Sequence, residues 1–274
     1  MRIVLLTGLV AALAQPVMAR QAKDWDVVRD PARQTTLVYT AFDVGLSIAV
    51  RCTGLSYQAL IAGLPPVDTA QRIIGVGFGD KEINDQRWNA TGDANIAVSS
   101  LPARFARELR EGGTLKLRVA GGAEDGRNLV YVLDLPASST AIDDSLTACG
   151  RPLVDARDAE VAEIGEGSLP NGFEWARMPA PEYPINNYLS GFVVLTCLSN
   201  PNGALRDCVV ETEYPQNGGF GTAALRSIRP ARVRAIDFPE DQTPTRFIEF
   251  RLNFAMEDEV QVRSRMPRDR VSPD

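Results

Sequence analysis

Histidine is absent from this chain of 274 residues, and its absence removes several chemistries at once. A Ser-His-Asp or Cys-His catalytic centre needs the imidazole base, and histidine is also the commonest metal ligand in proteins. The four cysteines include no Cys-x-x-Cys pair, which argues against a redox motif or a zinc site of that type. We therefore predict a protein that is not an enzyme and has no catalytic, cofactor or metal site.

Long hydrophobic runs are also missing beyond the N-terminus. The run from Ile3 to Ala14 follows one positive charge and leads to the small-residue site Val17-Met18-Ala19. This pattern is typical of a secretory signal peptide, and the run is shorter than the roughly 20 apolar residues that span a bilayer. We expect residues 1–19 to be removed and the protein to be periplasmic, secreted through the inner membrane. Membrane association is expected only if this segment is retained.

Basic residues are fewer than acidic ones, 29 against 35, and the formal net charge is −6. Such a chain does not bind a phosphate backbone without a local basic patch. The best candidate patch consists of Arg226, Arg229, Arg232 and Arg234, which we interpret as the solvated exit of a helix. No nucleic-acid partner is predicted.

The four cysteines become candidates for disulfides once the chain is exported to an oxidising compartment. They allow three connectivities. Residues 200–203, Asn-Pro-Asn-Gly, favour a reverse turn, and a hairpin centred there places Cys197 opposite Cys208. This leaves Cys52 and Cys149 as the second predicted pair.

Short motifs elsewhere suggest chemistry without completing it. The glycine-rich residues 75–80 lack the Lys-Ser/Thr of a phosphate loop and the third glycine of a dinucleotide site, so we interpret them as turns or bulges between strands. Asp143 and Asp144 are neighbours on an expected helix, where side chains diverge by about 100° and cannot share a proton. Residues 89–91, Asn-Ala-Thr, match the N-glycosylation pattern, to which we give little weight.

Residues 22–155 are rich in β-prone runs separated by turn clusters, with two helices expected at Pro102 to Glu111 and Ser138 to Thr147. Ser100 is the expected N-terminal cap of the first helix. The pattern favours a β-rich, sandwich-like N-terminal domain. Residues 156–178 are acidic and glycine-containing, which is typical of a linker, and residues 257–274 are predicted to form a disordered tail. The β-prone runs are 38–39, 46–52, 57–61, 73–78, 95–98, 115–119 and 130–133.

Residues 179–256 predict the order strand, strand, helix, strand. The segment opens Pro181-Glu182-Tyr183-Pro184, and a short helix is one interpretation of residues 183–189. The apolar strand 191–197 and its partner 205–210 flank the Asn-Gly turn, and a helix is expected at 222–228. In the last strand, Arg246 to Phe254, apolar residues at 248, 250, 252 and 254 alternate with polar ones, which is the pattern of a half-buried strand.

In these motifs and their order, the segment resembles the C-terminal domain of the TonB family. The resemblance implies a small domain with a three-stranded antiparallel sheet and one or two helices. The whole chain is therefore expected to be α+β, with the sandwich-like domain first and the TonB-like domain second. A sheet of this kind leaves an unpaired edge at its last strand, and in the family this strand pairs with a short segment of an outer-membrane receptor. The residues implied here as peptide-binding are Phe247, Glu249, Arg251 and Asn253.

The chain differs from an energy transducer of that family, because it has a cleavable signal and a short acidic linker in place of a membrane anchor and a long Pro-rich spacer. We expect a periplasmic TonB-like protein that binds an envelope protein or receptor peptide by strand addition and is linked to outer-membrane transport. The same edge could pair with a second copy and form a homodimer. Two alternatives are a membrane-anchored TonB-type transducer and an envelope hydrolase whose active site lies in the N-terminal domain.

We predict that the exported chain starts at Arg20, because the small-residue site after the apolar run suits signal peptidase. Intact-mass measurement of the protein purified from its native envelope checks this. A mass that includes residues 1–19 would favour the anchored alternative instead.

Overall fold

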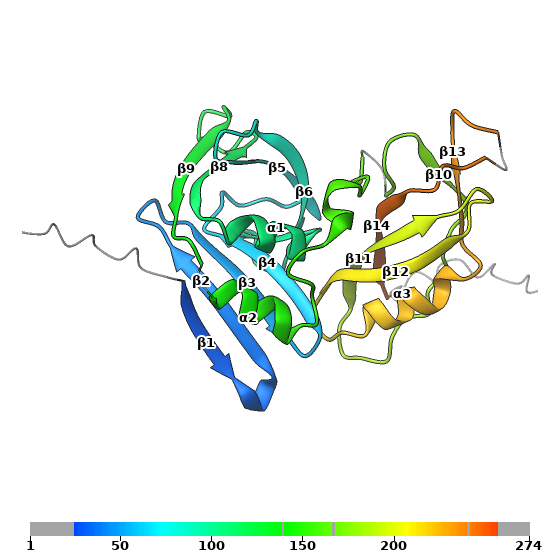
Figure 1. Cartoon of the computed structure of the whole chain (residues 1–274), viewed down its shortest axis with the longest axis horizontal. Coiled ribbons are helices and arrows are strands. Elements are labelled where there is room, and N and C mark those ends of the chain that lie inside the picture. The colour runs from blue at the N-terminus through cyan, green and yellow to red at the C-terminus, as the bar shows by residue number, and fades with distance from the viewer. Residues whose placement is uncertain (1–24, 139, 166–167, 240–241, 257–274) are drawn as a thin grey trace, which may run out of the picture.

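The computed structural model describes residues 25–138, 140–165, 168–239 and 242–256. Over these residues the protein is mostly β, with three α-helices and antiparallel sheets of nine, three and two strands (Figure 1). The expected β-rich N-terminal part and the expected three-stranded sheet near the C-terminus are both present. The predicted signal peptide and the predicted tail, residues 1–19 and 257–274, lie outside the described residues.

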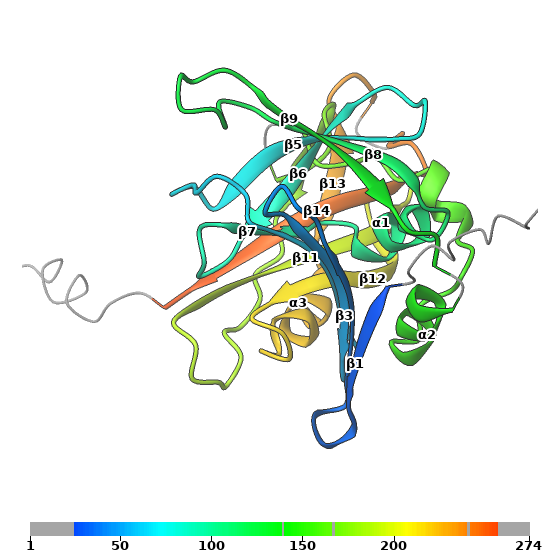
Figure 2. The same ribbon diagram turned by 90° about the vertical axis from the view of Figure 1, so that its left-hand side faces the viewer.

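One continuous sheet forms the N-terminal part, in the strand order β1-β2-β3-β4-β7-β6-β5-β8-β9. Its two halves run in different directions (Figures 1 and 2), so it is a single bent sheet and not two separate layers. The seven expected strands are found. Strands β1 and β6 were not predicted, because they are largely polar and show no clear β-prone run. The strands are β1 (Asp26–Asp30), β2 (Thr35–Ala41), β3 (Ser47–Thr53), β4 (Ser56–Ala62), β5 (Gln71–Phe78), β6 (Asn84–Ala90), β7 (Ile96–Ser99), β8 (Gly113–Val119) and β9 (Leu129–Leu135).

Two helices complete the core of this part, α1 (Pro102–Leu109) and α2 (Ala141–Ala148). Proline is favoured in the first turn of a helix, where its missing N–H costs no hydrogen bond. The predicted cap, Ser100, does not cap α1, because the N-cap residue is Leu101. Phe105 on the buried face of α1 meets the edge of Trp88, with ring centroids 5.1 Å apart. The Cys52–Cys149 disulfide ties β3 to the end of α2.

The C-terminal sheet has the order β12-β11-β14, with β11 (Ser190–Ser199) in the centre. Strands β12 (Leu205–Tyr214) and β14 (Phe247–Ala255) flank it, and helix α3 (Phe220–Ile228) packs on one face. The helix considered at 183–189 is not formed, since the Asn186 side chain accepts the Tyr188 N–H in a local turn.

The hairpin between β11 and β12 contains the predicted Cys197–Cys208 disulfide. A β-bulge shifts the register between residues 196 and 198, and Asp207 in the opposite strand has a φ of 51°. Gly203 in the turn has a φ of 74°, and a Cβ there would lie 2.0 Å from the Val233 carbonyl oxygen. Both predicted disulfides are thus present, and they suggest an extracytoplasmic location.

The described residues of the predicted linker, 156–165 and 168–178, are folded against both parts of the molecule. The segment begins with a 3-10 helix, η2 (Ala156–Ala159), and ends with β10 (Phe173–Arg177), which pairs with β13 (Arg232–Ala235). Between them, Ala162, Ile164 and Leu169 are buried. These three apolar side chains are too widely spaced to show a helix or strand period, which is why the pattern suggested a linker. A second short 3-10 helix, η1 (Pro31–Arg33), joins β1 to β2.

Among the described residues, no helix combines the length and the apolar character that crossing a membrane requires.

We predict that the two disulfides contribute unequally to stability. The Cys52–Cys149 bridge closes a sequence separation of 97 residues, and the Cys197–Cys208 bridge closes 11. On the chain-entropy model, the paired alanine variant C52A/C149A should lose about 4–5 kcal/mol of unfolding free energy and C197A/C208A about 3 kcal/mol. Urea unfolding of the full chain measures both, and an equal or reversed loss would contradict the prediction.

Candidate functional site

Strand β14 carries the four residues predicted to contact a peptide. The apolar residues at 248, 250, 252 and 254 are buried in the core with α3, as expected. The other face is less open than expected: Asn253 is exposed and Phe247 partly exposed, but Glu249 and Arg251 are only 3% and 9% exposed. The prediction that all four face outward is therefore wrong for Glu249 and Arg251, because the N-terminal part and residues 162–165 cover that side of the strand.

The outer edge of β14 is occupied along half of its length by the chain itself. The Ala162 N–H donates to the carbonyl of residue 247, and the N–H of residue 249 donates to the Ala162 carbonyl, both at 2.9 Å. The Arg251 N–H then donates to the Ser168 carbonyl at 3.4 Å. Asn253 is the next residue whose main chain faces away from β11, and no backbone bond from a described residue reaches that side of it.

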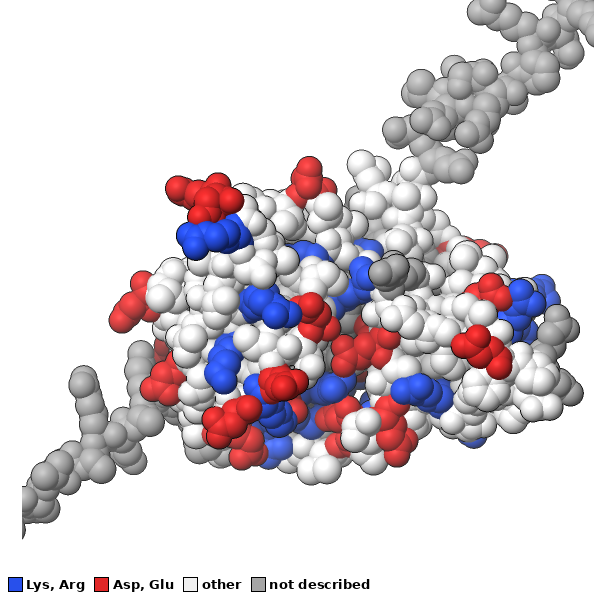
Figure 3. Space-filling view, turned by 90° about the horizontal axis from the view of Figure 1, so that it is seen from above, with Lys and Arg blue, Asp and Glu red and all other residues white. Residues whose placement is uncertain are grey.

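A cavity of about 360 Å³ lies between the β5–β6 hairpin, α1 and the segment that follows η2. Figure 3 shows the hollow between the two halves of the molecule, with side chains of both charge signs exposed in it. Val76, Phe78 and Phe105 contribute apolar wall, and Ser100 and Glu249 contribute polar wall. The volume is within the ~300–1,000 Å³ that small-molecule sites occupy.

Charged side chains around this cavity are mostly paired with one another, so their fields largely cancel. Glu82 and Arg87, which also line it, have opposite signs. Three ion pairs lie around the cavity: Arg104–Glu163 at 2.7 Å, Lys81–Glu108 at 3.0 Å and Arg118–Asp85 at 2.8 Å. Solvent-accessible ion pairs such as these contribute little to stability.

Glu249 is the buried carboxyl group of the cavity. Its Oε2 accepts the Ile164 N–H at 3.1 Å, and the Ser100 hydroxyl donates to the same carboxyl group. Burial raises the pKa of Glu249 to about 8, outweighing these hydrogen bonds, and the charges of Glu163 and Glu211 act in the same direction. At neutral pH the group is therefore mostly protonated, whereas an ordinary glutamate is ionised.

Two further polar groups lie buried beside Glu249 in the sheet. Thr196 is the register partner of Glu249 on β11, and its hydroxyl has no hydrogen-bond partner among the described residues. Arg251 lies with its guanidinium carbon 4.5 Å from the centre of the Phe192 ring, and its Nε also has no such partner. Burial lowers the pKa of Arg251 to about 10. Partly unsatisfied polar groups of this kind often mark functional regions.

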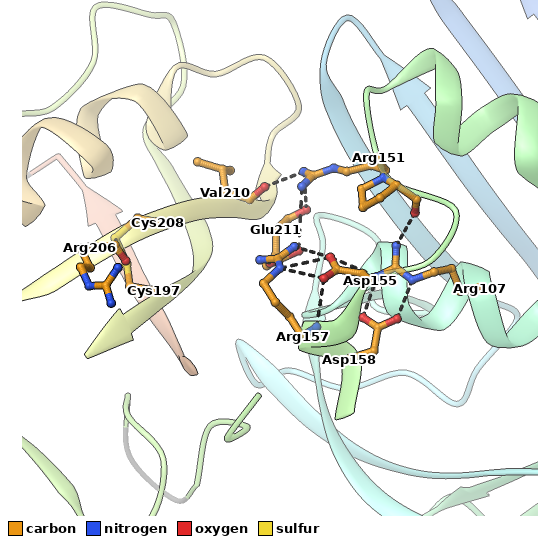
Figure 4. Close-up of polar contacts among 11 residues, drawn as sticks. Arg107, Arg151, Asp155, Arg157, Asp158, Cys197, Arg206, Cys208, Val210 and Glu211 are labelled. Atoms are coloured by element: carbon orange, nitrogen blue, oxygen red, sulfur yellow. Dashed lines mark hydrogen bonds and ion pairs between the residues drawn. A yellow bond between two sulfur atoms is a disulfide. The ribbon is translucent and has the colours of Figure 1, made fainter. Parts of the chain in front are cut away.

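A charged network fixes the two parts of the molecule relative to each other (Figure 4). Glu211 on β12 is buried and lies 3.2 Å from the Arg157 guanidinium and 4.0 Å from that of Arg151. Arg151 also donates to the main-chain carbonyl of Val210 at 2.5 Å. Burial lowers the pKa of Arg151, the charge of Glu211 opposing this effect.

Asp155 extends the network to helix α1. Burial alone would raise its pKa, but hydrogen bonds from Arg157 and the charges of Arg157 and Arg107 hold the pKa below its ordinary value. Arg107 on α1 donates bidentate hydrogen bonds to the Asp158 carboxylate, at 2.5 and 2.6 Å. Removing one member would leave a buried charge without its partner, which is far more costly than losing an exposed pair.

The remaining motifs have structural roles. Asp143 pairs with Arg110 at 2.5 Å and Asp144 with Arg29 at 2.8 Å, so the two carboxylates diverge as predicted. The interpretation of residues 75–80 as turns or bulges holds only for residues 79 and 80, because Gly75 and Gly77 lie within β5. A Cβ at either of these two positions would contact Ile83. Asn89 is fully buried and donates to Ser100 at 3.0 Å, which is incompatible with glycosylation.

Sequence reasoning missed the cavity and the charged network. Ser100, Arg104 and Arg157 stand in unremarkable surroundings in the sequence, and they become neighbours of β12 and β14 only through folding. Glu249 was singled out, but as an exposed peptide contact. In the four-arginine run, Arg234 pairs with Glu174, and Arg232 donates to the carbonyls of residues 229 and 231.

We predict that Glu249→Gln stabilises the protein at alkaline pH. The folded-state pKa lies above the unfolded value of 4.5, so stability from this group is complete below pH 4.5 and is lost as pH rises to about 8. Relative to wild type, the variant should gain on the order of 4 kcal/mol of unfolding free energy between pH 5 and pH 9. Urea unfolding at several pH values measures this. The exposed Glu182→Gln is the control, and parallel pH profiles for wild type and Glu249→Gln would contradict the assignment.

Comparison with protein-family models gives no match for this chain, and neither curated proteins nor solved structures show a matching relative. The candidate site is therefore defined by geometry, burial and charge.

Proposed function

We propose that this protein is an extracytoplasmic, TonB-like binding protein that takes up an extended segment of an envelope protein by strand addition at β14. The resemblance of residues 179–256 to the TonB C-terminal domain motivates the proposal. The sheet order β12-β11-β14, with the last strand at an edge, is compatible with it. The two disulfides agree with a location outside the cytoplasm.

The observation that carries this proposal is the backbone pairing of Ala162 with β14. Ala162 both donates to and accepts from that edge, which is how an added strand gains its affinity. The chain thus already uses the β14 edge to hold extended backbone. Beyond residue 251, the edge continues past Asn253 to the end of the strand, and this portion is the place for a partner segment.

The hydrolase alternative has one supporting feature, the buried and mostly protonated Glu249 in a cavity. Such a group can act as a general acid, but hydrolysis also needs a base or nucleophile near the scissile bond. The carboxylates of Glu163 and Glu108 in the same cavity are engaged by Arg104 and Lys81. Strand addition therefore explains more of the molecule and is the function we favour.

We predict that peptide binding depends on the main-chain N–H of Asn253. Because the N–H groups of residues 249 and 251 point away from β11, that of Asn253 does too, and Asn253→Pro removes an outward donor without breaking the β11 ladder. Linear dodecapeptides selected by phage display against the full chain should bind with about micromolar dissociation constants. We expect at least a tenfold loss with Asn253→Pro.

The matched control is Asn253→Ala, which keeps the N–H and should bind within about threefold of wild type. Size-exclusion chromatography of the same proteins tests the competing use of the edge, in which a second copy occupies it. Equal binding by the proline variant, or a monomer for which no peptide is selected, would contradict strand addition.

A further inference from the structure

Glu249 is a carboxyl group in the wall of a cavity of about 360 Å³, and it forms no ion pair with a cation of the described residues. Buried carboxylates in proteins are usually paired with a cation or bound to a metal. Three cations line the cavity: Arg104 pairs with Glu163, Lys81 pairs with Glu108, and Arg87 forms no ion pair with Glu249. Glu249 is therefore a buried acid of the cavity that has no ion pair with any described cation, so a counter-ion could come from a ligand.

The geometry points to a ligand with a primary ammonium group and a short apolar body, its charge paired with Glu249 and its carbon atoms against Phe78 and Phe105. The apolar wall formed by these two rings and Val76 suits a carbon chain. We infer that this cavity is an alkylammonium site.

The donor set argues against other cations. Ca²⁺ and Mg²⁺ take six or more oxygen ligands, and no group of three or more metal-binding side chains occurs in the described part of the chain. A guanidinium group prefers both oxygens of a free carboxylate, but the Ile164 N–H and the Ser100 hydroxyl already bind this one. An ammonium group can donate to the lone pairs of the Glu249 carboxylate that these two hydrogen bonds leave open.

The surroundings of Glu249 define how binding should depend on pH. The charged groups that act on it are Glu163 from the segment after η2 and Glu211 from β12, and both oppose its ionisation. Arg104 and Arg157 in turn pair with these two acids. An ammonium ion favours the ionised carboxylate, so ligand binding must displace the proton that Glu249 holds at neutral pH.

Two sources could supply the ammonium group, a free small amine or the lysine side chain of a bound segment. The second source rests on the proposed strand addition, and the first does not. The experiments therefore use n-pentylamine as the free probe, 1-pentanol as its uncharged counterpart, and a lysine-containing dodecapeptide selected on the full chain. Isothermal titration of the full-length protein measures all three.

We expect n-pentylamine to bind at least about tenfold more tightly at pH 8.5 than at pH 6.0, because the carboxylate ionises near pH 8. At pH 7.0, titration in two buffers of different ionisation enthalpy should detect the release of about one proton for each amine bound. The proton-release measurement uses only the wild-type protein, so it does not depend on whether any variant folds.

Glu249→Gln should weaken pentylamine at least tenfold at pH 8.5 and remove both the pH dependence and the proton release. Glu82→Gln, which removes an exposed charge at the same cavity, is the matched control and should leave them unchanged. No pentylamine binding, equal binding of 1-pentanol, or an unchanged Glu249→Gln variant would overturn the site.

Asn253→Pro separates this site from strand addition. It should weaken the peptide and leave pentylamine unaffected. If the peptide fails to bind but pentylamine behaves as expected, strand addition is wrong and the ammonium site stands for a free amine. If replacing the peptide's lysine with norleucine weakens binding at least tenfold only in protein with Glu249 intact, the lysine side chain is a ligand as well.

Discussion

The docking of strand β12 against the N-terminal part is the constraint on which the rest of the structure depends. A sheet edge exposes main-chain groups that need partners, and here the N-terminal part supplies them through side chains. Gln58 on β4 donates to the Glu213 carbonyl at 2.8 Å, and Arg151 donates to the Val210 carbonyl. Glu211, between them, holds Arg157 and so fixes the start of the segment that continues to β14. The edge of β12 thereby positions three parts of the chain, which contain Gln58, Arg151 and Arg157.

Covering that edge determines the environment of β14. Once β12 is docked, the second face of the C-terminal sheet turns toward the N-terminal part, and Glu249 and Arg251 become buried although they alternate with core residues in an amphipathic strand. The same docking brings Ala162 and Ser168 alongside β14. The molecule thus has one sheet edge closed by side chains and another closed in part by backbone.

The two proposals concern neighbouring features of β14 with different physical origins. Strand addition depends on the main chain at the far end of the strand, where Asn253 is exposed. The ammonium site depends on a side chain at its near end, where desolvation keeps Glu249 mostly protonated. Because main-chain pairing carries no charge and ion pairing is coupled to a proton, pH and salt should affect the two kinds of binding differently.

Local sequence patterns are enough to predict the individual elements: the seven β-prone runs, helices α1, α2 and α3, the hairpin with its Cys197–Cys208 pair and the buried residues at 248, 250, 252 and 254. These follow from periodicity and turn chemistry, which act over a few residues. Long-range packing, in contrast, brings Ala162 and Ser168 against β14 and buries Glu249. It also places Ser100 beside Glu249 and not at the N-cap of α1. The reason is physical: burial and pairing of a polar group depend on neighbours distant in sequence, and no local pattern encodes them.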